Sequence, residues 1–189
     1  MNLEEKFKLI KKRHREDLRK TEARAVLAPS VMRVCKTGTK EKVKYILEGI
    51  DIDYLRSVRN QTQFKRWFCK KLKTIVKAIK DKNKGNNRVG NGYGLATKVL
   101  ALYVRGMVLN RRYFTDKEVC RIEKWLYTPI DSVVIKELKK LGERLQFGKI
   151  KDIDQKSFYQ VQNRLGEAAE EVNVPRIWFD DVWAVREDT

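Results

Sequence analysis

Apolar residues recur at helical rather than alternating spacing along this 189-residue chain, and only three prolines interrupt it. The clearest segment runs from Gln63 to about Lys82, where the apolar residues fall on one face. Leu95–Leu109 is apolar on nearly every side, which is typical of a central buried helix. The spacing therefore predicts an all-α fold, a compact helical domain of about seven to nine helices.

The remaining helices are predicted from their boundary signals. We expect a charged first helix over residues 3–27 that ends at Pro29, and two short helices within Glu41–Val58. Thr115 and Glu118 have the spacing of a capping box for a helix that reaches Leu126.

Three more helices are predicted in the C-terminal part. Thr128, Pro129 and Asp131 predict a helix with proline at its first position. Ser157 with Gln160 predicts a helix through Val172, and a last short helix follows Asn173–Pro175. No repeat and no clear linker are visible, so we expect an N-terminal helical region, residues 1–59, to form one compact unit with residues 60–189.

The charge balance predicts a polyanionic partner. The 43 Lys and Arg against 25 Asp and Glu give a net charge of +18, which favours nucleic acid first and an acidic membrane surface second. On the segment from Gln63, the face opposite the apolar one is either a solvated surface or a stripe that faces phosphates. Its cations are Lys65, Arg66, Lys70, Lys73, Lys77 and Lys80.

The same composition excludes several other classes. No apolar stretch is long enough to span a membrane, and charges from position 4 onward do not fit a signal peptide. Cys35, Cys69 and Cys120 lie far apart, which is typical of reduced thiols in a cytoplasmic or nucleoid-associated protein. With His14 as the single histidine, we expect no metal site and no cofactor.

A glycine- and asparagine-rich stretch, Asp81–Gly94, separates the two strongest helices and predicts a loop or turn with several backbone positions at positive φ. Gly90, Gly92 and Gly94 lie between helices and not after a strand, which argues against a dinucleotide or P-loop site. Glycines at the start of a helix expose backbone N–H groups at its positive end, where a phosphate binds. A plain flexible hairpin is the alternative.

Lys98 and Asp131 are the candidate chemical groups. Lys98 lies near the start of an apolar helix, where a lysine either extends to the surface or stands at the rim of a pocket. A helix N-terminus and partial burial both favour its neutral, nucleophilic amine. Asp131, 33 residues later, is either the acidic member of a capping box with Thr128 or a carboxylate in the same cleft as Lys98.

These features, in this order, resemble the helix-hairpin-helix superfamily of DNA glycosylases. The similarity is greatest to the archaeal GO glycosylase type, which removes 8-oxoguanine, and covers about residues 60–185. Lys98–Met107 resembles the lysine-led apolar helix of that branch, and Pro129-Ile130-Asp131 resembles its catalytic acid segment. Asn173–Trp183 resembles its C-terminal segment. The chain departs from the family in the hairpin, where Arg88-Val89-Gly90 replaces the usual leucine-proline-glycine.

The resemblance implies a helix-hairpin-helix element and an activity. Lys98 would be the Schiff-base nucleophile and Asp131 the catalytic carboxylate of a glycosylase, possessing AP lyase activity if the imine eliminates. Double-stranded DNA would be the partner, and a target base would be flipped into a cleft. The implied phosphate contacts are Lys82, Lys84, Arg88, Gly90, Gly92 and Gly94, and the candidates for stacking on the base are Trp67, Tyr93, Trp178 and Trp183.

Two other functions remain open from the sequence. A non-catalytic DNA- or RNA-binding module accounts for the charge and the hairpin and makes Lys98 an ordinary residue. A helical domain that binds a protein partner, with charge for solubility, is the third. The excised base is 8-oxoguanine by family analogy alone.

Overall fold

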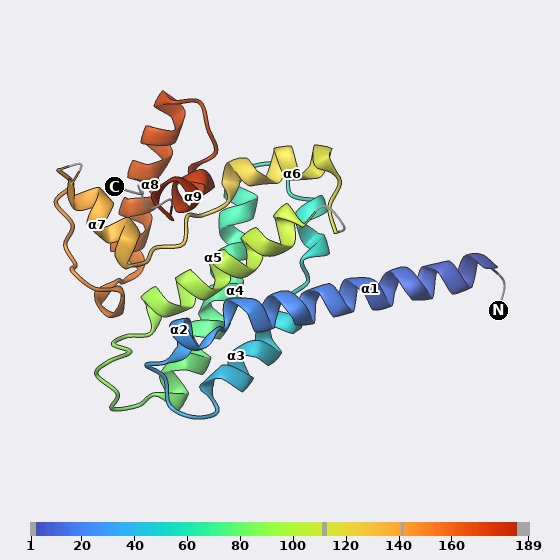
Figure 1. Ribbon diagram of the computed structural model, residues 1–189, viewed down its shortest axis with the longest axis horizontal. Coiled ribbons are helices and arrows are strands. Elements are labelled where there is room, and N and C mark those ends of the chain that lie inside the picture. The colour runs from blue at the N-terminus through green and yellow to red at the C-terminus, as the bar shows by residue number, and fades with distance from the viewer. Residues whose placement is uncertain (1–2, 111–112, 141, 185–189) are drawn as a thin grey trace.

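The structure is a computed structural model and describes residues 3–110, 113–140 and 142–184. Within these ranges it consists of helices and turns without a strand, which confirms the predicted all-α fold (Figure 1). The α-helices are α1 (Leu3–Val26), α2 (Pro29–Met32), α3 (Thr39–Glu48), α4 (Gln61–Lys82), α5 (Tyr93–Leu109), α6 (Asp116–Ile122), α7 (Ser132–Lys140), α8 (Gln155–Glu171) and α9 (Phe179–Ala184). Short 3-10 turns are η1 (Asp53–Arg56), η2 (Glu123–Trp125), η3 (Ile150–Asp152) and η4 (Arg176–Trp178).

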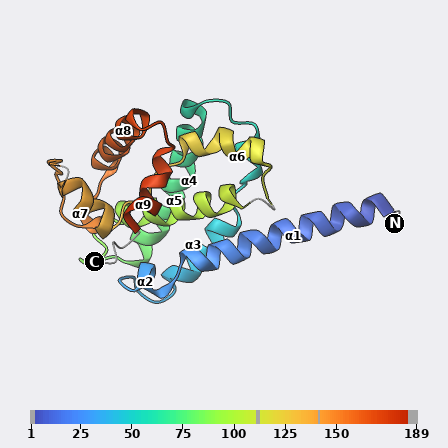
Figure 2. The same ribbon diagram turned by 45° about the horizontal axis from the view of Figure 1, so that its top comes forward.

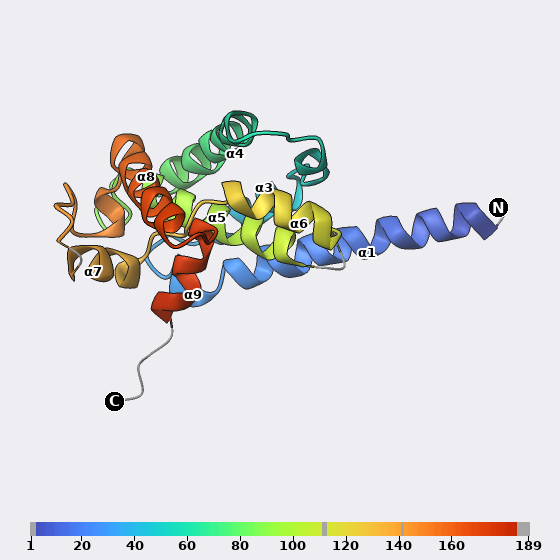
Figure 3. The same cartoon turned by 90° about the horizontal axis from the view of Figure 1, so that it is seen from above.

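Helix α5 is the centre of the fold, as its apolar sequence predicts. It packs against both α1 and α4, which lie on opposite sides of it in the view from above (Figure 3). Most of its side chains are buried, because it has neighbours on several sides. Its partly exposed face carries Lys98, Leu102 and Arg105, at helical spacing.

A single hydrophobic cluster joins the N-terminal and C-terminal parts of the chain. It includes Leu27 at the end of α1, Phe64 and Phe68 on α4, and Phe158 on α8. The ring of Tyr127 packs edge-on against Phe68, with centroids 4.9 Å apart. By contrast, the N-terminal half of α1 extends away from the rest of the molecule (Figures 1 and 2), and Leu9 and Ile10 are exposed there.

Some predicted helix boundaries are wrong for identifiable reasons. The first helix ends before Pro29, as predicted, but Pro29 itself begins α2, a short helix that was not predicted. Helix α7 starts at Ser132, so Pro129 is not in its first turn and Thr128 is not its cap. Thr128 is instead buried: its N–H donates to Gln162 Oε1 at 3.0 Å and its hydroxyl donates to the carbonyl of Arg176 at 2.7 Å.

Helix α8 starts two residues before Ser157. Its N-cap is Asp154, whose carboxylate accepts from the N–H of Ser157 at 2.8 Å, so Ser157 closes the capping box from the third helical position. The capping box of Thr115 with Glu118, at the start of α6, is confirmed. Across the described residues, no helix combines the length and apolarity that a bilayer crossing requires.

Candidate active site

Lys98 and Asp131 meet in the fold. Lys98 Nζ, on α5, lies 3.3 Å from Asp131 Oδ2, at the start of α7. Their side chains are 18% and 27% exposed, so the pair is sheltered but reachable from solvent. The structure therefore brings together the two residues that the sequence singled out.

Asp131 also caps α7. Its Oδ1 atom accepts hydrogen bonds from the N–H groups of Val133 at 2.9 Å and Val134 at 3.1 Å. One carboxylate oxygen thus caps the helix while the other faces Lys98. The predicted capping box with Thr128 is wrong, because Asp131 is itself the N-cap of α7. The positive end of α7 favours the ionised carboxylate.

Further charged residues lie on the same face of α5 as Lys98 and next to it. Arg105, two turns after Lys98, pairs with Asp180 on α9 at 2.6 Å and with Asp181. Burial raises the pKa of the Asp180 carboxyl, although Arg105 and Lys98 act against it, while Asp131 and Asp181 add to it. Asp180 is therefore electrostatically coupled to the Lys98–Asp131 pair.

Glu22, on α1, is a further acid that interacts electrostatically with Arg105. Burial raises the pKa of Glu22, and Arg105 opposes that rise. Its carboxylate lies against Gly106, where any Cβ atom would overlap it. Sequence reasoning missed Arg105, Asp180 and Glu22 as parts of the site, although the seven-residue spacing from Lys98 puts Arg105 on the same face.

The hairpin glycines have a packing role. Gly90 and Gly92 have φ of 61° and 72°, so the expected positive φ is confirmed at both. A Cβ atom at Gly90 would overlap the carbonyl oxygen of Lys151, and one at Gly94 would overlap that of Ile150. The η3 segment thus covers this side of the hairpin, and phosphate binding by its glycines stays a prediction.

The cations assigned to DNA lie on the surface. Lys82, Lys84 and Arg88 are all exposed. Arg88 lines a groove of about 400 Å³ that is also lined by Ser132, the residue next to Asp131. The groove has four cations and no carboxylate among its lining residues; the cations are Arg33, Arg88, Lys149 and Lys151. The groove therefore adjoins both the hairpin and the start of α7, and all its charged lining residues are cations.

The candidate stacking residues are dispersed. Trp67 is buried in the core against Phe64. Tyr93 packs against Phe158, and burial raises its pKa above the usual range. Trp178, 47% exposed, lies two residues before Asp180, whereas the side chain of Trp183 lies outside the described residues.

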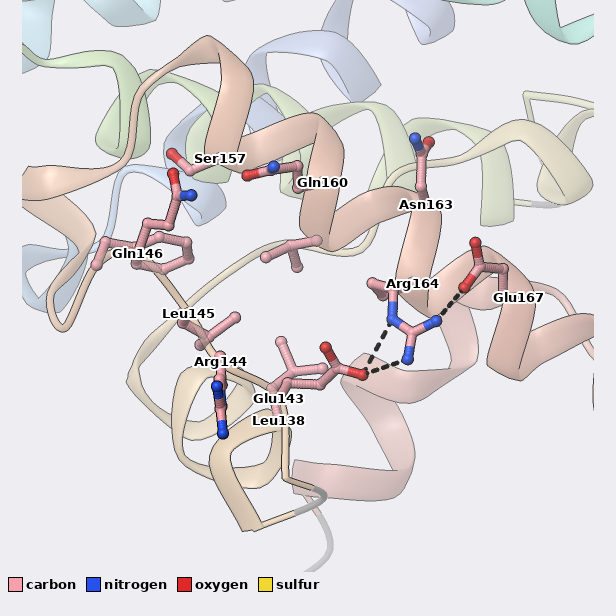
Figure 4. Close-up of a pocket in the computed structure, with 12 residues that line it drawn as sticks. Leu138, Glu143, Arg144, Leu145, Gln146, Ser157, Gln160, Asn163, Arg164 and Glu167 are labelled. Atoms are coloured by element: carbon pink, nitrogen blue, oxygen red, sulfur yellow. Dashed lines mark hydrogen bonds and ion pairs between the residues drawn. The ribbon is translucent and has the colours of Figure 1, made fainter.

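A cavity of about 370 Å³ between α7, the following loop and α8 is a weaker candidate (Figure 4). Three of its four charged lining residues pair with one another: Arg164 pairs with Glu143 at 2.7 Å and with Glu167 at 2.5 Å. Both carboxylates raise the pKa of this guanidinium. In the described part of the chain, no group of three or more His, Cys, Asp or Glu is placed to hold a metal ion.

Comparison with known proteins identifies no relative. No protein-family model matches the sequence, and no curated protein and no solved structure matches it.

Proposed function

We propose that the protein is a DNA glycosylase with AP lyase activity, of the helix-hairpin-helix type that the sequence resembles. One observation carries the proposal: Lys98 Nζ lies 3.3 Å from Asp131 Oδ2, although 33 residues separate them. A primary amine and a helix-capping carboxylate, both partly exposed, are the groups that Schiff-base excision requires.

In the proposed reaction the target nucleotide leaves the base stack so that its C1′ atom becomes reachable. Lys98 first transfers a proton to solvent, so that Asp131 stays ionised. Its amine then forms a bond to C1′ as the bond from C1′ to the base breaks, and the base leaves with a proton. Asp131 stabilises the positive charge that develops on the sugar.

The lyase half follows from the same adduct. The bond from C1′ to O4′ opens, O4′ takes a proton, and Lys98 is left as a protonated imine. Loss of a proton from C2′ then expels the 3′ phosphate, and water hydrolyses the imine to release Lys98. No redox partner is consumed in these steps.

The charge distribution supports DNA as the substrate. The groove that carries Arg88, Lys149 and Lys151 is also lined by Ser132, next to Asp131, and its charged lining residues are all positive. Phosphate contacts there would make binding salt-dependent. The preference for 8-oxoguanine rests on the resemblance, so a panel of damaged bases belongs in the test.

Borohydride trapping tests the proposal. Borohydride reduces the imine to a stable amine, so a duplex with an 8-oxoguanine or an abasic site should become covalently attached to the protein. Lys98→Gln and Lys98→Arg should both abolish the adduct, since neither forms an imine. Lys136→Gln, which changes an exposed lysine on α7, should not.

The other outcomes separate the alternatives. Tight DNA binding without an adduct on any lesion of the panel would contradict the glycosylase and support the non-catalytic nucleic-acid module. No binding to DNA at low salt would contradict both nucleic-acid functions and support a domain that binds a protein partner.

A further inference from the structure

The outer face of α4 carries a straight line of cations. Successive members are four, three, four and three residues apart: Arg66, Lys70, Lys73, Lys77 and Lys80. At 3.6 residues per turn they fall within a sector of about 80°, and at 1.5 Å per residue the line is about 21 Å long. We call these five residues the α4 ladder.

The positive charges of the ladder are not neutralised by ion pairs in the described part of the chain, and the ladder is held facing solvent. All five side chains are exposed, and none of them pairs with a carboxylate in the described part of the chain. The opposite face of α4 is buried through Phe64, Phe68, Ile75 and Ile79, so the helix cannot turn its cations away from solvent. Five like charges in a row cost repulsion, which a linear polyanion would relieve.

An apolar cavity of about 280 Å³ adjoins the ladder. Cys69, Leu72 and Val76 supply apolar lining, and Tyr93 and Gln155 line it from α5 and α8. Three members of the ladder also line it, Lys73, Lys77 and Lys80, with Asp81 as the single acid. The site therefore combines an apolar, aromatic cavity with positive charge.

This surface is separate from the candidate active site. In the view from above, α4 and α9 lie on opposite sides of α5 (Figure 3). Asp180 on α9 marks the side of Lys98, whereas the ladder points away from the core that α4 shares with α5. A ligand on the ladder would not occupy the Lys98–Asp131 pair.

We propose that the α4 ladder and its cavity bind single-stranded nucleic acid, with phosphates along the ladder and one base in the cavity against Tyr93. Positive charge that follows the backbone, combined with an aromatic contact for a base, is the general mode of single-strand binding. An acyl chain with one anionic headgroup would leave Arg66 and Lys70 unused. A membrane would need exposed apolar residues beside the ladder, whereas most apolar residues of α4 are buried in the core.

The test measures the affinity of fluorescent oligothymidylate and oligouridylate as a function of salt. The variant R66Q/K70Q/K73Q/K77Q should bind at least about tenfold more weakly at 0.1 M salt, and its salt slope should fall by about 3. The matched control K20Q/K42Q/K117Q/K139Q removes the same charge from scattered exposed sites and should lose far less. Equal losses in the two variants would overturn the proposal.

Two measurements test the cavity and the class of ligand. Val76→Phe fills the cavity without changing charge, so it should weaken single-strand binding and leave duplex binding unchanged. Equal single-strand binding by Val76→Phe and the parent would contradict the proposal that a base occupies the cavity. Stronger binding to phosphatidylserine vesicles than to oligonucleotides would favour a membrane and overturn the proposal.

This inference does not rest on the proposed glycosylase activity. Lys98→Gln should keep full single-strand affinity, and the ladder variant should still form the borohydride adduct at saturating duplex. In the parent protein, single-strand binding without any borohydride adduct contradicts only the glycosylase, and an adduct without single-strand binding contradicts only the ladder.

Discussion

Asp131 Oδ2 lies 3.3 Å from Lys98 Nζ while Asp131 Oδ1 caps α7, so one carboxylate caps a helix and pairs with a lysine at once. Asparagine caps helices about as well as aspartate but carries no charge. Asp131→Asn should therefore keep nearly the parental unfolding free energy, whereas Asp131→Ala should lose about 1 kcal/mol. Both variants should lose most of the base excision.

Denaturant unfolding and single-turnover excision on the same samples check this separation. If Asp131→Asn retains the parental excision rate, the charge of Asp131 is not needed, and the proposed role of Asp131 fails.

Arg105 is predicted to hold α9 against α5. Arg105→Gln leaves Asp180 without its ion pair, which should lower the unfolding free energy by about 2 kcal/mol at pH 7 and raise the pKa of Asp180 further. Because the folded-state pKa then exceeds the unfolded one, the variant should regain stability as the pH falls through that raised value. The measurement is denaturant unfolding at several pH values.

The double variant Arg105→Gln/Asp180→Asn is the control, since it removes the unpaired carboxylate. It should recover part of the loss at pH 7. A loss from Arg105→Gln that is the same at pH 7 and pH 4 would contradict the ion-pair explanation.

Gly90 and Gly85 form a matched pair of glycines with positive φ, 61° and 73°. Nothing lies within 4 Å of a Cβ atom at Gly85, whereas at Gly90 it would overlap the carbonyl of Lys151. Gly85→Ala should cost about 1 kcal/mol for its backbone conformation alone. Gly90→Ala should cost roughly 2 kcal/mol more, because η3 must move.

Thermal and denaturant unfolding of the two variants provide the comparison. Similar losses would mean that the approach of η3 to the hairpin contributes nothing.

Glu118 is predicted to make the unfolding free energy of the protein fall at acid pH. Burial pushes the pKa of Glu118 upward, but hydrogen bonds from Arg56 and Thr115 outweigh it and hold the value at about 2, below the usual 4.5. Because the folded pKa is the lower one, the stabilisation is complete above pH 4.5 and is lost as the pH falls toward 2. Glu118→Gln should therefore cost about 1–2 kcal/mol at pH 7 and flatten the loss in that window.

Unfolding free energies measured between pH 2 and pH 7 check this prediction. Glu171→Gln, which changes an exposed carboxylate at the end of α8, is the control and should keep the parental profile. An unchanged profile in Glu118→Gln would refute the assignment.

Local signals in the sequence were sufficient for most of the secondary structure. The capping box of Thr115 with Glu118 and the positive φ of Gly90 depend on neighbouring residues, so both were predictable. The predicted start of α7 failed because distant residues intervene: buried Thr128 bonds to Gln162 and Arg176, and α7 starts at Ser132.

For the site, the sequence by itself determined the all-α class, the excess of positive charge and the residue types at 98 and 131, because periodicity, composition and spacing are properties of the chain alone. Only the tertiary structure decided that Lys98 and Asp131 are in contact, that Asp180 and Glu22 converge on Arg105, and that η3 covers Gly90 and Gly94. Such contacts join residues far apart in sequence, and the packing of helices around α5 fixes them.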